Sequence, residues 1–384
     1  MYQGTIQILF PLLRSAICGT RLTEDESSVY SLEVLRELLK ISSKHDIDNL
    51  LAYGIKQNEL VSDGNGALDN RMFKAIYRYE TMNYEYGLVT DTLEREKIAF
   101  IPLKGAVIRG YYPEPWMRTS CDIDILVKRS ELQRGIDVLT AAGYTLKSYN
   151  THDVSLYSAS GVHIELHFDL VEDGRANKCS EILNNVWSYV HLKSGCEYWY
   201  EMSDEMFWFY HIAHMAKHFE EGGCGIRPFL DMWILESRVA YDEKRRELLE
   251  GGELLRFSEC CEKLSRVWFD GEEHDGVSHA LEEYILRGGV YGTVENRVAA
   301  KQTKEGGRVK YFLSRIFLPY DTLKMVYPVL QKHKWLLPAM QVRRWFRVVF
   351  GGRAKVAMHE LEANRSMSRE SLDTTEKLFE NIGL

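Results

Sequence analysis

Hydrophobic and polar residues follow a helical period through the first quarter of the chain. Leucines recur every three or four residues in Ser31–Ser42 (SLEVLRELLKIS), which is typical of an amphipathic helix. A second stretch with this spacing covers about 71–95. The polar, glycine-containing segment Val61–Asp69 lies between them and predicts a loop. We therefore expect a helical N-terminal region over residues 1–95.

Short apolar runs and alternating patterns replace the helical period over residues 96–175. They predict strands at Ile98–Leu103, Asp122–Val127, Tyr144–Tyr149, Val154–Ser158 and Val162–Leu170. A helix is expected at Ser130–Ala142, where Ser130 and Gln133 match a capping box and Gly143 marks the end. This order predicts an α/β (α+β) fold with a small mixed sheet and helices packed on it.

Helical spacing returns after residue 176. Helices are predicted at Glu205–Glu220, Arg227–Val239 and Leu281–Leu286. Arg343–Phe350 is basic and aromatic, and it predicts an amphipathic helix used in domain packing or, alternatively, in contact with an acidic partner. The polar end, 361–384, indicates a loosely held helix or tail. We expect a helical domain over 176–300 and a C-terminal helical region with a tail over 301–384, so that helical regions flank the sheet-containing core.

Composition narrows the class of protein. The 384 residues suggest two or three domains, and 45% hydrophobic with 27% charged residues is typical of a folded protein. A net charge of −8 argues against a long nucleic acid as the partner, because such binding needs excess Lys and Arg. The seven cysteines form no C-x-x-C pair, which indicates reduced thiols.

The N-terminal segment Ile6–Leu13 is apolar, but no basic region precedes it and Pro11 interrupts it. It predicts an amphipathic helix, with a signal peptide as the alternative. No apolar run reaches the length of a membrane span. Together with the reduced thiols, this predicts a cytoplasmic protein without a membrane partner.

Two aspartates share one face of the strand predicted at Asp122–Val127. Side chains alternate along a strand, so Asp122 and Asp124 point to one side while Ile123 and Ile125 enter the core. Neighbouring carboxylates repel each other unless a cation lies between them. Magnesium prefers oxygen ligands of this kind, so the pair predicts a metal site.

A third carboxylate follows from the same alternation. Glu165, His163 and His167 share one face of their strand, and Glu165 joins the two aspartates if that strand lies beside Asp122–Val127. Three carboxylates would hold two magnesium ions for a phosphoryl transfer, and Glu165 is also a candidate proton acceptor. The two histidines either touch substrate or only flank the metals.

Basic and glycine residues precede the aspartates. Lys104 and Gly105 follow a strand and open a helix, where free N–H groups and a close backbone suit a phosphate. Arg118 offers a forked grip for a second phosphate or for the acceptor. The alternatives are a solvated lysine, a turn glycine and an arginine that pairs with the aspartates.

The order LKGAVIRGYYPEPWMRTSCDIDILV … VHIELHFDL resembles the nucleotidyltransferase superfamily that shares its fold with polymerase β. More narrowly, it is similar to an uncharacterised bacterial family in that group. The later segment HIAHMAKHFEEGGCGIRPFLDMW fits as well. The resemblance implies that Asp122, Asp124 and Glu165 are catalytic metal ligands and that Lys104 and Gly105 lie at the triphosphate. It also implies nucleotide-binding roles in the cleft for His214, His218, Arg227 and Asp231.

Each of the later residues has a second interpretation. His211, His214 and His218 lie with Phe207 on one helix face, which is also the pattern of a packed seam. We assign His211 to the seam and the other two histidines to the cleft. Arg227 and Asp231 are one helical turn apart and are candidates for pairing with each other.

These patterns together predict a metal-dependent nucleotidyltransferase. It would move a nucleoside monophosphate from a nucleoside triphosphate such as ATP to a small-molecule or protein acceptor, and release pyrophosphate. Two alternatives stay open. One is a non-catalytic nucleotide-binding or regulatory module with the same fold. The other is a metallohydrolase built from His211, His214, His218 and Asp231.

Overall fold

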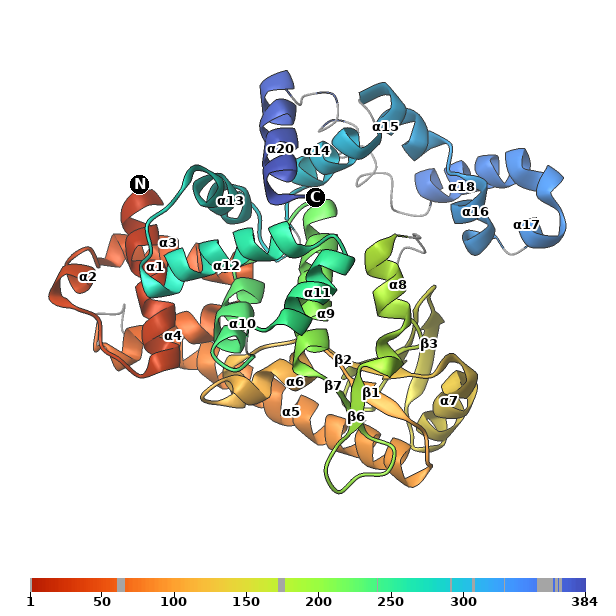
Figure 1. The fold of residues 1–384 in the computed structure, drawn as a ribbon, viewed down its shortest axis with the longest axis horizontal. Coiled ribbons are helices and arrows are strands. Elements are labelled where there is room, and N and C mark those ends of the chain that lie inside the picture. The colour runs from red at the N-terminus through yellow and green to blue at the C-terminus, as the bar shows by residue number, and fades with distance from the viewer. Residues whose placement is uncertain are drawn as a thin grey trace. The chain divides into compact units, whose positions relative to one another are not determined.

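The computed structural model describes residues 2–60, 66–171, 177–239, 241–290, 292–305, 308–327, 329–350, 362, 365 and 368–384 (Figure 1). The chain divides into two compact units. The first unit comprises Met1–Met215 and Ile226–His279, and the second unit comprises Ala216–Gly225 and Ala280–Leu384.

A five-stranded mixed sheet lies in the first unit, with strand order β1-β2-β5-β4-β3. Its strands are β1 (Phe100–Pro102), β2 (Asp122–Val127), β3 (Thr145–Tyr149), β4 (Asp153–Tyr157) and β5 (His163–His167). β2 and β5 pair in parallel and the other neighbours are antiparallel. The expected α/β fold with a small mixed sheet and flanking helices is confirmed.

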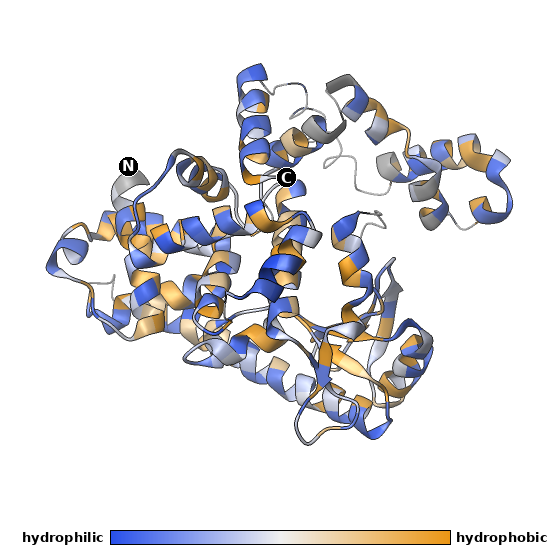
Figure 2. Cartoon of the chain, in the orientation of Figure 1, coloured by the Kyte–Doolittle hydropathy of each residue, from blue (hydrophilic) through white to orange (hydrophobic). Residues whose placement is uncertain are grey.

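The hydrophobic core lies on one face of this sheet, under helices α5 (Ala67–Arg95) and α7 (Leu132–Ala141) (Figure 1). Val89 and Leu93 of α5 and Ile136 of α7 pack in one cluster with Ile123 and Ile125 of β2. In Figure 2 the central strands are coloured hydrophobic, as burial under helices requires. The alternation in β2 therefore directs its aspartates to the face opposite α5 and α7.

A short hairpin covers the outer edge of β1. It consists of β6 (Val190–Leu192) and β7 (Tyr200–Met202), which pair antiparallel. The Phe100 amide donates to the carbonyl of Tyr198 at 3.0 Å, and Trp199 bridges Phe100 in parallel. The hairpin thus satisfies backbone groups of a strand that would otherwise be a free edge.

Local sequence explains the N-terminal helices α1 (Tyr2–Cys18), α2 (Glu24–Ser28), α3 (Leu32–His45) and α4 (Asp48–Gln57). The Ser31 side chain caps α3 by accepting from the Val34 amide, and α3 ends where Asp46 turns left-handed. Of the predicted loop Val61–Asp69, residues 61–65 lie outside the described part, and α5 begins at Ala67.

Two local predictions are wrong. The expected capping box at Ser130 and Gln133 does not form, because a 3₁₀ turn (η3, Arg129–Glu131) precedes α7 and the Gln133 side chain donates to Asp137 instead. Glu131 accepts from the Ala99 amide, so a tertiary contact with the start of β1 fixes this turn. β5 also ends before the predicted Leu170, since the Phe168 and Asp169 amides bond the His152 carbonyl outside the ladder.

Helices follow the sheet. Those that begin in the first unit are α8 (Lys178–Asn184), α9 (Asp204–Glu220), α10 (Arg227–Glu236), α11 (Glu243–Gly251), α12 (Leu255–Asp270) and α13 (Gly276–Arg287). The later ones are α14 (Val294–Glu305), α15 (Arg308–Ile316), α16 (Tyr320–Val326), α17 (Val329–Lys332), α18 (Leu337–Phe350) and α20 (Arg369–Ile382).

The end of the chain was predicted as a loosely held helix or tail, and it does contain a helix, α20, but this helix is packed. α20 buries Leu378, Phe379 and Ile382, and the Phe379 ring meets Tyr284 edge-on at 6.0 Å. These three apolar residues lie on one face of a helix that is otherwise mostly polar, so the average polarity of the segment did not reveal that it is packed.

None of the helices in the described ranges combines the length and apolar composition needed to cross a membrane. All seven cysteines are described, and none forms a disulfide.

A buried imidazole in the first unit makes stability depend on pH. His45 at the end of α3 is fully buried and accepts from the Ile226 amide at 3.3 Å, while its Nε2 has no hydrogen-bond partner among the described residues. Burial, then Lys44, lowers the pKa of His45 to about 4. The unfolded chain therefore binds more protons than the folded chain between pH 6.5 and 4.

We expect the free energy of unfolding to fall by up to about 3 kcal/mol as pH drops through this window, with no contribution from His45 above it. The measurement is the free energy of unfolding of His45→Gln, from urea denaturation at several pH values. Plotted against pH between 6.5 and 4, it should have a smaller slope than that of wild type. His333→Gln, which changes an exposed imidazole, is the control and should keep the wild-type slope. An unchanged slope in His45→Gln would contradict the assignment.

Candidate active site

The register of two parallel strands brings the three predicted carboxylates together. Asp124 of β2 pairs with Glu165 of β5, and Asp122 pairs with His163. Asp124 is 3% exposed, whereas Asp122 and Glu165 are half-buried. Ligand atoms gather within 4.8 Å in two overlapping groups, Asp122–His163–Glu165 and Asp124–Glu165–His167.

Asp124 is held between two nitrogen groups. Its Oδ1 accepts from the Lys104 ammonium at 2.9 Å and lies 2.8 Å from His167 Nε2. Burial alone would raise the pKa of Asp124, but Lys104 and His167 hold it well below its usual range. Asp124 is therefore ionised at any physiological pH.

The neighbouring carboxylate behaves differently. Burial, and then the charge of Asp124, raise the pKa of Asp122 to about 6. The cations respond in the opposite sense: burial would lower the pKa values of Lys104 and His167, yet their contacts with Asp124 raise both. Negative charge is thus concentrated here, and it is only partly compensated by the side chains of the chain itself.

A divalent cation fits this arrangement. The two candidate groups share Glu165 and contain carboxylate oxygens from both strands, which hard cations such as magnesium prefer. Burial and then the charge of Asp124 raise the pKa of Asp122, and a bound metal ion would favour its ionised form. In the structure, Lys104 and His167 neutralise part of the negative charge at Asp124.

The Lys104–Gly105 turn is bound to β2. Lys104 has φ 45° and ψ −122°, a conformation that favours glycine, and its side chain turns back to Asp124. The Leu103 amide donates to the Asp124 carbonyl at 3.0 Å. A Cβ on Gly105 would lie 3.2 Å from Ser120 Cβ, so glycine allows this close approach. The short helix α6 (Gly105–Ile108) follows.

Arg109 holds this turn in place, and the sequence reasoning missed it. Its Nε donates to the Gly105 carbonyl at 2.8 Å, and its Nη2 donates to Ser120 Oγ at 2.6 Å. Burial, then nearby Arg118, lower the pKa of Arg109 to about 10. In the sequence, Arg109 is recognisable only by its place four residues after Gly105. That spacing alone does not distinguish it from an arginine on the surface.

Arg118 is buried and bound to Asp231 of α10, not to Asp122 or Asp124. Its Nε lies 2.8 and 3.0 Å from the two Asp231 oxygens, and Tyr112 donates to Asp231 at 2.7 Å. Burial would raise the pKa of Asp231, but Arg118 lowers it. A Cβ on Gly105 would lie 3.5 Å from Arg118 Nη1, so the Arg118–Asp231 pair packs against the Lys104–Gly105 turn.

The suggested pairing of Arg227 with Asp231 is wrong. Arg227 Nη1 donates to Asp46 at the end of α3 and to Thr119 Oγ1 at 3.3 Å. Local helical spacing suggested Asp231, but a partner 181 residues away in sequence is nearer. Asp46, Thr119 and Arg227 tie the N-terminal helices to the segment that leads into β2.

The three histidines of α9 have different surroundings. His211 is buried, its Nε2 lies 3.0 Å from the Pro228 carbonyl, and burial lowers its pKa. His214 is half-buried, 6.3 Å from the Tyr210 ring, and His218 belongs to the second unit. Within the described residues, His211, His214, His218 and Asp231 do not gather as a metal site. The metallohydrolase alternative therefore lacks support.

Tyr210 is a second residue that the sequence reasoning missed. It is buried on α9, and burial raises the pKa of its phenol. Lys104 opposes this shift, and Asp124, Glu165 and Asp122 add to it, so Tyr210 lies within the electrostatic field of the site. In the sequence it is one more aromatic residue on a buried helix.

The geometry defines a class of protein. Three carboxylates from neighbouring strands of a small mixed sheet face away from a helix-covered core, beside a Lys–Gly turn. That is the arrangement of a nucleotidyltransferase catalytic core.

Comparison with known families agrees. A family model described as "Uncharacterised nucleotidyltransferase" matches residues 34–267, more than half of the chain, and the chain belongs to this family. No curated protein and no solved structure shows significant similarity to it.

Proposed function

We propose that the chain transfers a nucleoside monophosphate from a nucleoside triphosphate to an acceptor hydroxyl. The observation that carries the proposal is the pairing of Asp124 with Glu165 across β2 and β5, which supports a three-carboxylate site with Asp122. The acceptor oxygen bonds to the α-phosphorus, the bond from that phosphorus to the β-phosphate oxygen breaks, and pyrophosphate leaves. Glu165 accepts the hydroxyl proton.

Asp122, Asp124 and Glu165 would hold two magnesium ions, which when bound supply charge neutralisation of the triphosphate. Burial and then the charge of Asp124 raise the pKa of Asp122 to about 6, and a cation beside it would stabilise the ionised carboxylate, which supports this role. Ionisation of Asp122 as pH rises through 6 would then accompany the onset of metal binding.

Lys104 and Gly105 are proposed to contact the triphosphate. Lys104 would exchange Asp124 for a phosphate oxygen, a change that its flexible stem permits. Arg109 positions Gly105 through its carbonyl, and Asp231 positions Arg118. Arg227 would act through Asp46 and Thr119.

We further propose that His214 lines the nucleotide cleft; the same role for His218, which belongs to the second unit, stays a sequence-based prediction. The likeness to the polymerase β fold, a cytoplasmic location, and the exclusion of long nucleic acids as acceptors belong to the same proposal. The net charge of −8 supports the last point.

The test is calorimetric binding of each of the four nucleoside triphosphates with magnesium. Wild type should bind at least one of them in a magnesium-dependent way, and Asp122→Ala/Asp124→Ala should lose that binding, because the metal bridge to the phosphates is removed. Asp137→Ala, an exposed aspartate on α7, is the matched control and should bind as wild type does.

Binding of a triphosphate without any pyrophosphate release, with every acceptor tried, would favour a non-catalytic nucleotide-binding module. Absence of binding to all four triphosphates would reject the proposal.

A further inference from the structure

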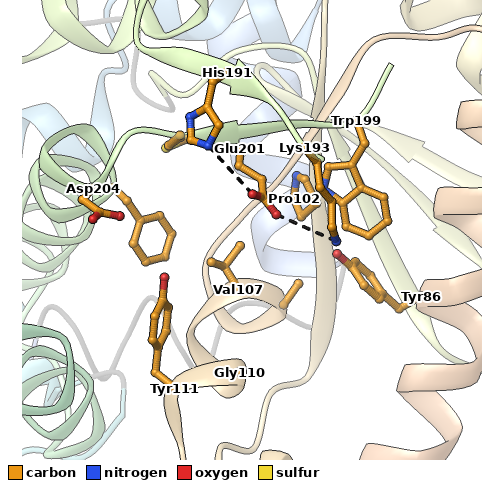
Figure 3. Close-up of a pocket in the computed structure, with 13 residues that line it drawn as sticks. Tyr86, Pro102, Val107, Gly110, Tyr111, His191, Lys193, Trp199, Glu201 and Asp204 are labelled. Carbon is orange, nitrogen blue, oxygen red and sulfur yellow. Dashed lines mark ion pairs between the residues drawn. The ribbon is translucent and has the colours of Figure 1, made fainter. Parts of the chain in front are cut away.

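The cavity drawn in Figure 3 lies between α6, the β6–β7 hairpin and the start of α9, and it has a volume of about 410 Å³. Its charged side chains pair with one another, since Glu201 lies 3.9 Å from His191 and 3.8 Å from Lys193. The Lys193 ammonium also lies 3.5 Å from the centre of the Trp199 ring. The chain's own lysine therefore occupies the cation site that Trp199 and Glu201 form. Apolar and basic side chains are exposed together in the second unit instead, on helix α18.

One face of α18 attaches this helix to its own unit. Trp345 Nε1 donates to the Ile316 carbonyl at the end of α15, at 2.8 Å. Leu337 and Met340 pack against the buried cluster that contains Leu323. These contacts hold the helix in place without using its opposite face.

The opposite face of α18 is apolar and exposed. Val342, Phe346 and Phe350 follow one another at intervals of four residues, so they form a stripe on one side of the helix, the α18 stripe. They are 42%, 59% and 80% exposed, and the Phe346 and Phe350 rings stack with 6.0 Å between their centres. Trp335, which is 77% exposed, lies in the 3₁₀ turn just before the helix. Exposed apolar surface of this kind is typical of a site for a partner or a membrane.

Positive charge accompanies the α18 stripe. Residues 329–350 contain five Lys or Arg residues and no Asp or Glu, whereas the whole chain has a net charge of −8. Arg343 and Arg347 each follow a residue of the stripe and are exposed on its flank, and Lys332 and Lys334 are exposed shortly before the helix. The complementary surface is therefore one that is acidic and also accepts aromatic and aliphatic side chains.

We propose that the α18 stripe, together with Trp335, binds the surface of a membrane that contains anionic phospholipids. The rings and Val342 enter the boundary between headgroups and acyl chains, and the flanking arginines and lysines meet lipid phosphates. A nucleic acid fits this face less well, because bases stack on rings but leave an aliphatic side chain such as Val342 without a partner.

This contact does not depend on nucleotidyl transfer, and it needs no helix that crosses the bilayer. Anionic lipids are present on the cytoplasmic leaflet, which agrees with the location proposed above. The contact differs from the sequence-based prediction of no membrane partner, because that prediction rested on the length of apolar runs, which does not reveal a helix lying on the surface.

The test is co-sedimentation of the full chain with vesicles of equal parts phosphatidylglycerol and phosphatidylcholine, and with vesicles of phosphatidylcholine alone. The chain should bind the anionic vesicles at least about thirtyfold more tightly, because only they attract the basic residues. Arg343→Gln/Arg347→Gln should weaken binding to the anionic vesicles about thirtyfold. Phe346→Ser/Phe350→Ser should weaken it at least about tenfold, because two rings are no longer buried in the lipid. All four side chains are exposed, so these variants should fold as wild type does.

The matched controls are exposed residues of α5 in the first unit. Phe73→Ser/Tyr77→Ser removes two rings that are 69% and 75% exposed, and Lys74→Gln/Arg78→Gln removes two exposed basic charges. Both control variants should bind the anionic vesicles as wild type does. Equal losses in the α18 and α5 variants would overturn the proposal, because binding would then depend on overall charge and exposed rings. Absence of binding of wild type to the anionic vesicles would overturn it as well.

Fluorescence gives the place of the contact independently. Anionic vesicles with brominated acyl chains should quench the tryptophan fluorescence of wild type, and Trp335→Phe should lose most of that quenching. Quenching that persists in Trp335→Phe would place the contact elsewhere and overturn the proposal.

Two other occupants of this face give distinct results. Binding of a single-stranded oligonucleotide but not of vesicles, lost in Arg343→Gln/Arg347→Gln, would make it a nucleic-acid site. Self-association without vesicle binding, abolished in Phe346→Ser/Phe350→Ser, would make it an interface between two copies of the chain. Either result would overturn the membrane contact and leave the proposed nucleotidyl transfer unaffected.

Discussion

Replacing Asp124 by asparagine is expected to slow magnesium-dependent pyrophosphate release by at least about 1,000-fold, because the change removes a charge from the proposed metal site. Asp124 is the carboxylate that contacts both Lys104 and His167, and it is the most buried of the three. The rate is measured with the preferred nucleotide and with water or an added acceptor as nucleophile.

The matched control for this substitution is Asp137→Asn on the exposed face of α7, which should release pyrophosphate at the wild-type rate. Both variants lose one carboxylate charge through a nearly isosteric change. Comparing their rates therefore separates a role in the site from a general effect of net charge. If Asp124→Asn retained more than a tenth of the wild-type rate while remaining folded, Asp124 would not be a catalytic ligand.

Removing Asp231 should cost about 3–5 kcal/mol of folding free energy, because it leaves the guanidinium of Arg118 buried without its partner. Tyr112 would lose its acceptor as well. The measurement is urea denaturation of Asp231→Ala. Arg118→Met/Asp231→Leu, which replaces both charges by apolar groups, should be much less destabilised.

Removing one member of an exposed pair gives the comparison. Lys178 and Glu253 pair at 2.9 Å with both side chains largely exposed, so Glu253→Ala should change stability by less than about 1 kcal/mol. Equal effects of Asp231→Ala and Glu253→Ala would mean that the buried pair contributes little to folding.

Strand alternation carried most of the predictive power of the sequence. It placed Asp122 and Asp124 on one face and Ile123 and Ile125 in the core, as the structure has them. The class of fold and the nucleotidyltransferase family were also predictable. Strand alternation depends on neighbours within a few residues, and the family is indicated by the order of short motifs along the chain; a single sequence displays both directly.

The partners of the charged residues were not predictable in the same way. Arg118 meets Asp231 across 113 residues, and Arg227 meets Asp46 across 181. Helical spacing favoured a pairing of Arg227 with Asp231 because local periodicity contains no information on distant contacts. Arg109 and Tyr210 were missed for the same reason, since only the folded chain brings them to Gly105 and to the carboxylates.

The backbone of Lys104 has a consequence for engineering the protein. A non-glycine residue at φ 45° and ψ −122° costs on the order of 1–3 kcal/mol, which glycine would not incur. Lys104→Gly removes that cost together with the ammonium beside Asp124. The two effects on stability oppose each other, because Lys104→Gly leaves the buried carboxylate of Asp124 with His167 alone. A screen that requires turnover should therefore retain lysine in spite of the backbone strain.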